Sequence, residues 1–278
     1  MNHKSKLCPH IIEGYNGALH MRTAQGLYAE PAIIKLVNPS LTYIREVREL
    51  YRESLLVIRF TEEESWQIKL KDPENYARQW VSNHSQLINA AKSLMPIAFE
   101  GVNEVPDDYA ELAVRAELTR LRLLHELNAY GSYLNSSVGT PDFPVWSTYE
   151  PVLAAMDPRF EYIGMHAYWS DYNNLLLSTW HFQRWRMIKE HTKGRKIILS
   201  EIGSDYLPDI NTGGGAWDRG ISREEYLKEL VAADELMRKD EQIVGGCVFT
   251  LGFIGRWGPF NMNDMWDTVR ETSPVLLT

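Results

Sequence analysis

The stretch Met95-Pro-Ile-Ala-Phe-Glu-Gly-Val-Asn-Glu104 begins as a short apolar run and ends in a polar pair, Asn103-Glu104. A second stretch of the same design, Lys196-Ile-Ile-Leu-Ser-Glu-Ile-Gly203, places Glu201 directly after an apolar run. Such runs are typical of strands that are buried on both faces. A carboxylate just past such a strand lies at the C-terminal edge of a sheet, where parallel α/β folds carry their chemistry. The two stretches therefore predict a pair of glutamates at one edge of one sheet.

Predicted strands and helices alternate along the whole chain. The strands are expected at residues 10–15, 32–37, 55–60, 95–104, 130–136, 162–168, 196–203 and 244–249. The helices are expected near 21–28, 43–52, 72–94, 107–128, 145–156, 180–191, 222–239 and 263–271. This pattern predicts an α/β protein, a (β/α)8 TIM barrel that spans residues 1–278 as a single domain. An open, doubly wound sheet is the alternative, but the first turn, Glu13-Gly-Tyr-Asn-Gly17, lacks the GxGxxG spacing of such folds.

Composition narrows the possible partners and the location. The net charge of −8 gives no electrostatic argument for binding nucleic acid or an anionic membrane. No run approaches the roughly 18 apolar residues of a membrane span, and Met-Asn-His-Lys-Ser-Lys at the N-terminus lacks the apolar core of a signal peptide. We therefore expect a cytoplasmic protein, or a secreted one if a leader has been removed. Cys8 and Cys247 are too few for a disulfide framework.

Two carboxylates at strand ends are the groups that glycoside cleavage requires. One must stay protonated to donate to the leaving oxygen, which burial and a neighbouring negative charge favour. The other must stay ionised near the anomeric carbon, which hydrogen-bond donors favour. Asn103, His166 and Tyr168 are candidates for the same polar site. The alternative is that the two glutamates only form ion pairs with Arg59 or Lys35.

Three motifs resemble those of clan A glycoside hydrolases, which are retaining (β/α)8 enzymes. Phe99-Glu-Gly-Val-Asn-Glu104 resembles the E-x-x-N-E motif that ends the fourth strand, and this resemblance implies that Glu104 is the acid/base. Ser200-Glu-Ile-Gly203 is similar to the seventh-strand motif and implies that Glu201 is the nucleophile. His166-Ala-Tyr168 matches the sixth-strand pattern in which a tyrosine hydroxyl touches the nucleophile. The motifs fall on the fourth, sixth and seventh predicted strands.

The chain also departs from the clan pattern. Many members carry an arginine near the end of the second strand, where this chain has Lys35, and its Arg59 lies on the third strand. Members often have a tryptophan at the end of the eighth strand, where this chain has Phe249-Thr-Leu-Gly-Phe253. Glu100 matches the first glutamate of the E-x-x-N-E motif, and we interpret it as a buried structural hydrogen-bonding group. The family within the clan stays open.

Tryptophans follow three of the predicted strands on the catalytic side: Trp169, Trp217 and Trp257. Flat aromatic faces in such loops bind sugar rings, and the alternative for any one of them is that it caps the core. With a carbohydrate as the expected partner, the predicted substrate-binding residues are Arg59, Asn103, His166, Tyr168, Trp169 and Trp257.

Other activities have weaker support. The protein could be a carbohydrate-binding barrel without catalysis, although the presence of both glutamates argues against this. A buried lysine such as Lys35 suits a Schiff-base lyase or aldolase, but it more often forms a salt bridge, here with Glu13 or Glu100. The histidines form no HxH pair and no HExxH helix, so we expect neither a metal nor another cofactor. Gly213-Gly-Gly215 has no following Lys-Ser/Thr and is interpreted as a mobile loop.

Overall fold

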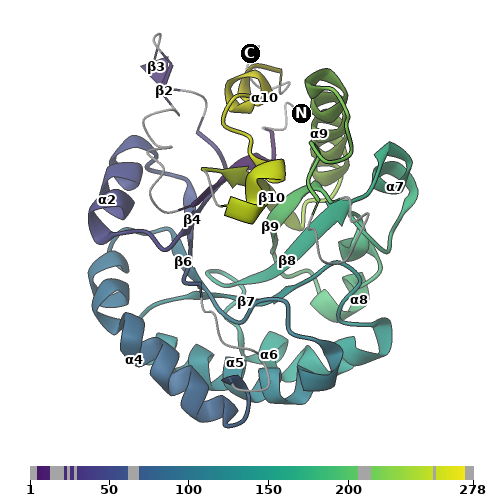
Figure 1. Ribbon diagram of the computed structural model, residues 1–278. Helices are drawn as coiled ribbons and strands as arrows, with labels where there is room; N and C mark the ends of the chain where they lie inside the picture. The colour runs from purple at the N-terminus through teal and green to yellow at the C-terminus, as the bar shows by residue number, and fades with distance from the viewer. Residues whose placement is uncertain are drawn as a thin grey trace.

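Parallel strands close into a barrel in the order β1-β10-β9-β8-β7-β6-β5-β4, which confirms the predicted (β/α)8 fold (Figure 1). The structure is a computed structural model that describes residues 5–12, 22–23, 26–27, 30–61, 69–205, 214–252 and 255–272. The barrel strands are β1 (Leu7–Ile12), β4 (Ile33–Val37), β5 (Leu55–Arg59), β6 (Ile97–Glu100), β7 (Gly131–Ser136), β8 (Tyr162–Trp169), β9 (Ile197–Ser204) and β10 (Ile243–Leu251).

Helices surround the barrel as an outer ring (Figure 1). The α-helices are α2 (Leu41–Leu50), α4 (Pro73–Ala91), α5 (Ala110–Glu126), α6 (Glu150–Ala155), α7 (Tyr172–Leu177), α8 (Lys189–Thr192), α9 (Arg223–Arg238) and α10 (Trp266–Thr272). The 3₁₀ helices are η1 (Asp107–Tyr109), η2 (Phe143–Tyr149), η3 (Arg184–Arg186) and η4 (Gly255–Phe260). Ser222 and Glu225 form a capping box at the start of α9. The segment predicted as one helix over 145–156 is a 3₁₀ helix, η2, up to Tyr149 and an α-helix, α6, from Glu150.

The helix predicted near residues 21–28 is wrong. The described part of this segment is a short antiparallel pair, β2 (Arg22–Thr23) and β3 (Gly26–Leu27). Thr23 is β-branched, and Gly26 loses more backbone entropy in a helix than any other residue, so both disfavour the helical conformation. Strand β1 is real but begins three residues before its predicted start, and residues 13–15 lie outside the described part of the chain.

The single helix predicted over 180–191 is also wrong, since the segment consists of η3 and the one-turn helix α8. Four consecutive side chains, at residues 182–185, are buried. A regular helix turns each side chain by about 100° from the last and cannot bury four in a row against one surface. Gln183 instead turns back, and its Nε2 donates to the carbonyl oxygens of Leu175 and Leu176 at the end of α7. Packing has overridden helical propensity here.

The barrel interior has an apolar layer below a polar one. The apolar layer is Cys8, Ile33, Leu55, Val57, Ala98, Ile198 and Cys247. Side chains of a strand alternate between its two faces, so the residue two positions further along also points inward. On four of the strands this next residue is polar: His10, Lys35, Arg59 and Glu100. The same alternation that builds the barrel core therefore places ionisable groups just above it, toward the C-terminal ends of the strands.

Candidate active site

Glu201 reaches the barrel interior because of a β-bulge in β9. Two consecutive residues of β8, 165–166, pair with Leu199 and Glu201, which are two apart. The ladder between β9 and β10 shows the same extra residue in β9. Ser200 is that extra residue, and a bulge of this kind re-aims the side chain that follows it. Uninterrupted alternation from Ile198 would point Ser200 into the barrel in place of Glu201.

The Glu201 carboxylate accepts hydrogen bonds from groups on three other strands. Its Oε1 accepts hydrogen bonds from Arg59 Nη1 at 2.5 Å and from Lys35 Nζ at 3.2 Å. Its Oε2 accepts one from the Tyr168 hydroxyl at 2.9 Å and lies 3.5 Å from His166 Nδ1. The side chain is 8% exposed. A carboxylate in these contacts is held in one orientation at the bottom of the barrel mouth.

Electrostatics favour the ionised form of Glu201. Burial on its own would raise the pKa of this carboxyl. The positive charges of His166, Lys35 and Arg59 outweigh that effect, so the pKa of Glu201 lies well below its ordinary value. Burial and the negative charge of Glu201 raise the pKa of Tyr168 well above its ordinary value, which keeps its hydroxyl available as a hydrogen-bond donor.

Lys35 forms the predicted buried salt bridge with Glu100. Its Nζ lies 2.9 Å from Glu100 Oε2 and 3.2 Å from Glu201 Oε1, and its side chain is fully buried. Glu100 is itself 1% exposed, which confirms its interpretation as a buried structural group. An ammonium group engaged by two carboxylates carries a proton where a Schiff-base lysine needs a lone pair. The other predicted partner of Lys35, Glu13, lies outside the described residues.

Glu104 lies on a loop four residues after β6, and Asn135 of β7 fixes its place. The backbone N–H of Glu104 donates to the carbonyl oxygen of Asn135 at 3.0 Å. The Asn135 side chain donates to the carbonyl oxygen of Val102, also at 3.0 Å. Asn135 in turn needs glycine at position 164, because a Cβ there would overlap its side-chain oxygen. Glu104 has a φ of 52°, the left-handed region that L-residues seldom adopt.

His166 connects the two glutamates. Its Nδ1 lies 2.8 Å from Glu104 Oε1 and 3.5 Å from Glu201 Oε2. The His166 side chain is fully buried, whereas that of Glu104 is 42% exposed. Burial and the charge of Glu201 act to raise the pKa of Glu104. The charge of His166 and its hydrogen bond act to lower this pKa and outweigh them, so the net shift is downward. The expectation that the pKa of the acid is raised is therefore wrong.

The remaining predicted polar residues lie beside the two glutamates. Asn103 immediately precedes Glu104, and its Oδ1 is buried without a hydrogen-bond partner among the described residues. A buried amide oxygen of this kind is costly unless something donates to it. Arg59, predicted to bind substrate, directs its guanidinium to Glu201 and keeps 19% of its side chain exposed. The structure thus brings Arg59, His166 and Tyr168 together around the carboxylates, and Asn103 adjoins Glu104 in the chain.

Trp169 is not in the barrel mouth, so its predicted role as a sugar-stacking residue is wrong. The residue is 1% exposed, and its Nε1 donates to Glu229 Oε2 of α9 at 2.7 Å. The ring also packs edge-on against Phe182 at 5.2 Å. Tyr168 faces the interior, so alternation sends the next residue of β8 outward between the barrel and its helices. Trp169 is a packing residue.

Trp257 lies nearer the carboxylates, within a cluster of aromatic rings. The centroid of its ring lies 5.7 Å from that of Phe249, in an edge-on arrangement, and 5.9 Å from that of Phe260. Phe249 and Phe260 in turn contact the Tyr168 ring at 6.3 and 6.2 Å. Trp257 is half-buried. The cluster lies at the end of β10, on the side of the site where Tyr168 holds Glu201.

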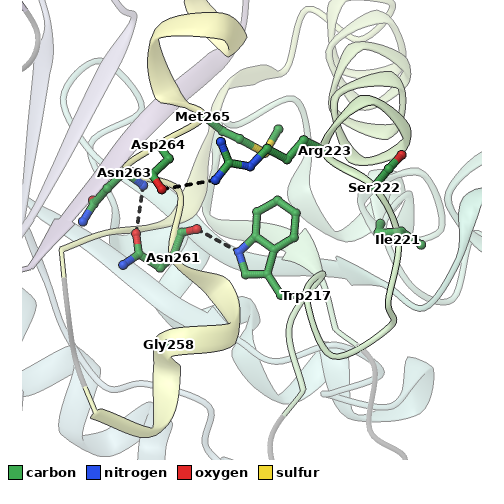
Figure 2. Close-up of a pocket in the computed structure, with 9 residues that line it drawn as sticks. All are labelled: Trp217, Ile221, Ser222, Arg223, Gly258, Asn261, Asn263, Asp264 and Met265. Atoms are coloured by element: carbon green, nitrogen blue, oxygen red, sulfur yellow. Dashed lines mark hydrogen bonds and ion pairs between the residues drawn. The ribbon is translucent and has the colours of Figure 1, made fainter.

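Trp217 belongs to a separate pocket of about 540 Å³ between the start of α9 and the η4–α10 segment (Figure 2). Its Nε1 donates to the Asn261 carbonyl oxygen at 2.9 Å, and Arg223 forms an ion pair with Asp264 at 3.2 Å. The pocket is lined by Trp217, Ile221, Ser222, Arg223, Gly258, Asn261, Asn263, Asp264 and Met265. Neither glutamate lines it. The predicted mobile loop at 213–215 falls partly outside the described residues, and Gly215 packs against Pro259.

Sequence reasoning missed two residues of the site, His10 and Asp205. His10 Nε2 lies 3.7 Å from Glu201 Oε1, its Nδ1 is 2.9 Å from Thr250 Oγ1, and burial lowers the pKa of His10 to about 4. The alternation from Cys8 was a signal that could have found it. Asp205 directly follows β9, and burial together with the charge of Glu104 raises its pKa to about 6. No motif in the sequence singles out Asp205.

Within the described ranges, no group of three or more histidine, cysteine or acidic side chains is arranged to hold a metal ion. In the same part of the chain, no helix is both long enough and apolar enough to cross a membrane.

No protein-family model and no curated protein matches the sequence. Solved structures do match. A GH2 β-galacturonidase from Eisenbergiella tayi bound to galacturonate has a TM-score of 0.61 at 12% identity, over 99% of this chain and 52% of that one. The endo-β-1,4-glucanase Xac0029 from Xanthomonas axonopodis pv. citri has a TM-score of 0.55 at 11% identity, over 98% of this chain and 100% of that one.

Thermotoga maritima Cel5A in complex with cellobiose has a TM-score of 0.51 at 13% identity, over 87% of this chain and 85% of that one. The likeness is one of fold. At this level of identity it agrees with the clan A resemblance of the three motifs and leaves the activity to be argued from the site itself.

Proposed function

We propose that this protein is a retaining glycoside hydrolase that cleaves O-glycosidic bonds of an oligo- or polysaccharide by double displacement. The observation that carries the proposal is the position of His166 Nδ1, 2.8 Å from Glu104 and 3.5 Å from Glu201. The two nearest carboxylate oxygens cannot lie farther apart than these distances together. One imidazole thus bridges the two carboxylates at close range, and this favours direct attack over the wider separation of the carboxyl groups, about 6.5–9.5 Å, that inverting enzymes need for a water.

In the first step, Glu201 attacks the anomeric carbon, and the bond from that carbon to the leaving oxygen breaks. Its contacts with Arg59, Lys35 and Tyr168 support this role, because they keep the carboxylate ionised and fixed in direction. The product of the step is a glycosyl ester of Glu201. Orientation of this kind accounts for much of the rate in a step between preplaced groups.

Glu104 and His166 act as a pair that holds one proton. When the pair is protonated, the proton lies between Glu104 Oε1 and His166 Nδ1, and Glu104 delivers it to the leaving oxygen. In the second step the deprotonated Glu104 takes a proton from water as that water attacks the anomeric carbon and releases Glu201. The exposed side chain of Glu104 allows it to exchange protons and to meet the leaving group.

We assign the substrate contacts to Asn103 and Trp257. Asn103 Oδ1 accepts a hydrogen bond from a sugar hydroxyl, which satisfies an otherwise unpartnered buried oxygen. Trp257 supplies an aromatic face beside the Tyr168 side of the site. Since two of the similar solved structures are a complex with cellobiose and an endo-β-1,4-glucanase, β-linked glucans are the first substrates to test.

The test is a screen of aryl β-glycosides and β-glucans with the purified protein, followed by ¹H NMR of the first-formed sugar. We expect hydrolysis of at least one substrate class, with the anomeric configuration retained. Inverted product would overturn the mechanism. Saccharide binding measured by calorimetry without any hydrolysis would overturn the enzymatic function and support the carbohydrate-binding barrel.

A further inference from the structure

Lys35 is shared by two buried carboxylates that have unequal tasks. Its ammonium lies 2.9 Å from Glu100 Oε2 and 3.2 Å from Glu201 Oε1. The side chains of Lys35 and Glu100 are both completely buried, and that of Glu201 is 8% exposed. Charges interact strongly over such distances when water is excluded. A change at Glu100 therefore reaches Glu201 through the lysine between them.

Glu100 is unsuited to bind substrate or to carry protons itself. It lies within β6 at 1% exposure, one layer deeper than Glu104. Burial would raise the pKa of Glu100, but the charges of Lys35 and Arg59 outweigh it and the net shift is downward. Glu100 is thus a fixed negative charge next to the lysine. Its effect on Glu201 is electrostatic.

A nucleophilic carboxylate has two conflicting needs. It must be ionised to attack, and positive neighbours favour the ionised form. The same neighbours withdraw electron density from the attacking oxygen, so an excess of positive charge slows attack and speeds departure of the carboxylate in the second step. Groups that face Glu201 contribute both signs of charge; they are His10 from β1, Lys35 from β4, Arg59 from β5, Glu100 from β6, Glu104 beyond β6, and His166 and Tyr168 from β8.

We propose that Glu100 is a positioning residue that acts through Lys35: it draws the ammonium partly away from Glu201 and so limits the positive charge that the nucleophile experiences. The kinetic part of this inference rests on the proposed function. The electrostatic part does not, because it concerns the ionisation of Glu201 in the folded protein.

The central variant is Glu100→Gln, which keeps the shape of the side chain and removes its charge. Lys35 then acts on Glu201 alone. We expect the acidic limb of the kcat/KM profile to move to lower pH by about half to one pH unit. We also expect kcat/KM, which reports attack, to fall about three- to tenfold, while kcat holds or rises for substrates limited by the second step.

Glu117→Gln is the matched control. Glu117 is a buried carboxylate whose Oε2 pairs with Arg120 Nε at 2.6 Å, outside the group of side chains around Glu201. Its substitution removes the same charge from a comparable environment and is expected to lower the melting temperature without moving the acidic limb. The double variant Lys35→Met/Glu100→Gln removes both charges together. The acidic limb of its kcat/KM profile should return toward the pH at which the wild type shows it.

A ¹³C NMR titration of the glutamate carboxyls, with Glu201 assigned from the Glu201→Gln spectrum, reads the same effect without turnover. We expect Glu201 to titrate at lower pH in Glu100→Gln than in the wild type. An unchanged Glu201 titration, or an equal shift in Glu117→Gln, would overturn the role of Glu100. Absence of hydrolysis on all substrates would instead count against the proposed function, because the titration still reports the charge effect.

Discussion

Glu201 and Glu104 face the same barrel mouth but are held in opposite ways. Glu201 lies within β9, is buried, and receives contacts from groups on β4, β5 and β8. Glu104 lies on a loop with a left-handed backbone, keeps 42% of its side chain exposed, and has His166 as its close ionic partner. The closed sheet therefore positions one carboxylate, whereas a loop, the His166 imidazole and a hydrogen bond with Ser137 position the other.

The difference follows from what each group does in the proposed reaction. A nucleophile benefits from one orientation and one charge state, which a dense set of buried partners provides. An acid/base changes its protonation twice in a cycle, so it needs contact with solvent and a partner that can share a proton. Variants at the two glutamates and at their neighbours test this distinction.

Glu201→Ala should have the largest effect. Without the attacking carboxylate we expect turnover to fall by more than about 10⁴-fold on every substrate, activated or not. The measurement is kcat/KM on aryl glycosides with good and poor leaving groups, with circular dichroism to verify that the variant is folded. A residual rate within about a hundredfold of the wild type would contradict the role of Glu201.

Glu104→Ala should have a smaller effect that depends on the substrate. Poor leaving groups need a proton in the transition state, so their rates should fall by about 10²- to 10⁴-fold, and the first step with activated aryl glycosides should fall far less. Pre-steady-state rates across a series of leaving-group pKa values provide the test. A loss of equal size across the series would show that Glu104 is not the acid.

Trp169 and Trp257 provide a second comparison, between a buried packing residue and a half-buried residue beside the site. Trp169→Ala should lower the free energy of unfolding by about 3–5 kcal/mol, because it removes a fully buried ring together with its hydrogen bond to Glu229. Trp257→Ala should raise KM and change stability much less. Denaturant unfolding and substrate kinetics on both variants separate the two roles, and the reverse pattern would show that their assignments are exchanged.

His10 is buried beside Glu201, and its titration makes the free energy of unfolding depend on pH. Its pKa is about 4 in the folded protein, below the ordinary value of 6.5. The unfolded chain therefore binds an extra proton between these values, so this contribution to stability is complete above pH 6.5 and is lost as pH falls toward 4. The loss amounts to about 3 kcal/mol. His10→Asn should flatten the curve of unfolding free energy against pH by that amount, and parallel curves for variant and wild type would contradict the assignment.

Hydrophobic runs and their alternation with helical segments were sufficient to predict the barrel, the strands that carry His166, Tyr168 and Glu201, and the strand that precedes Glu104. They could not predict the bulge at Ser200, because a bulge is a property of strand pairing and has no local signature in Leu-Ser-Glu. A strictly regular β9 would have directed Glu201 out of the barrel. The apolar run placed Glu201 at the C-terminal edge of the sheet, and the resemblance to the clan implied its role as nucleophile.

The positions of Trp169 and His10 could have been predicted from strand alternation. Counting alternate residues from Tyr168 would have placed Trp169 on the outer face, and counting from Cys8 would have placed His10 inside. The segment 172–192 is different in kind. Its conformation depends on burial of residues 182–185 against their surroundings and on Gln183 reaching back to α7, and neither is visible in helical propensity.

Covalent trapping is the direct test of Glu201 as the nucleophile. A panel of activated 2-deoxy-2-fluoro-β-glycosides slows release of the glycosyl ester, and peptide mass spectrometry locates the labelled residue. We predict one sugar per protein on the peptide that contains Glu201, absent from the Glu201→Gln variant and still formed, with an activated leaving group, in Glu104→Ala. A label on any other residue, or rapid turnover of a substrate whose fluorosugar leaves no label while the product is inverted, would contradict the account.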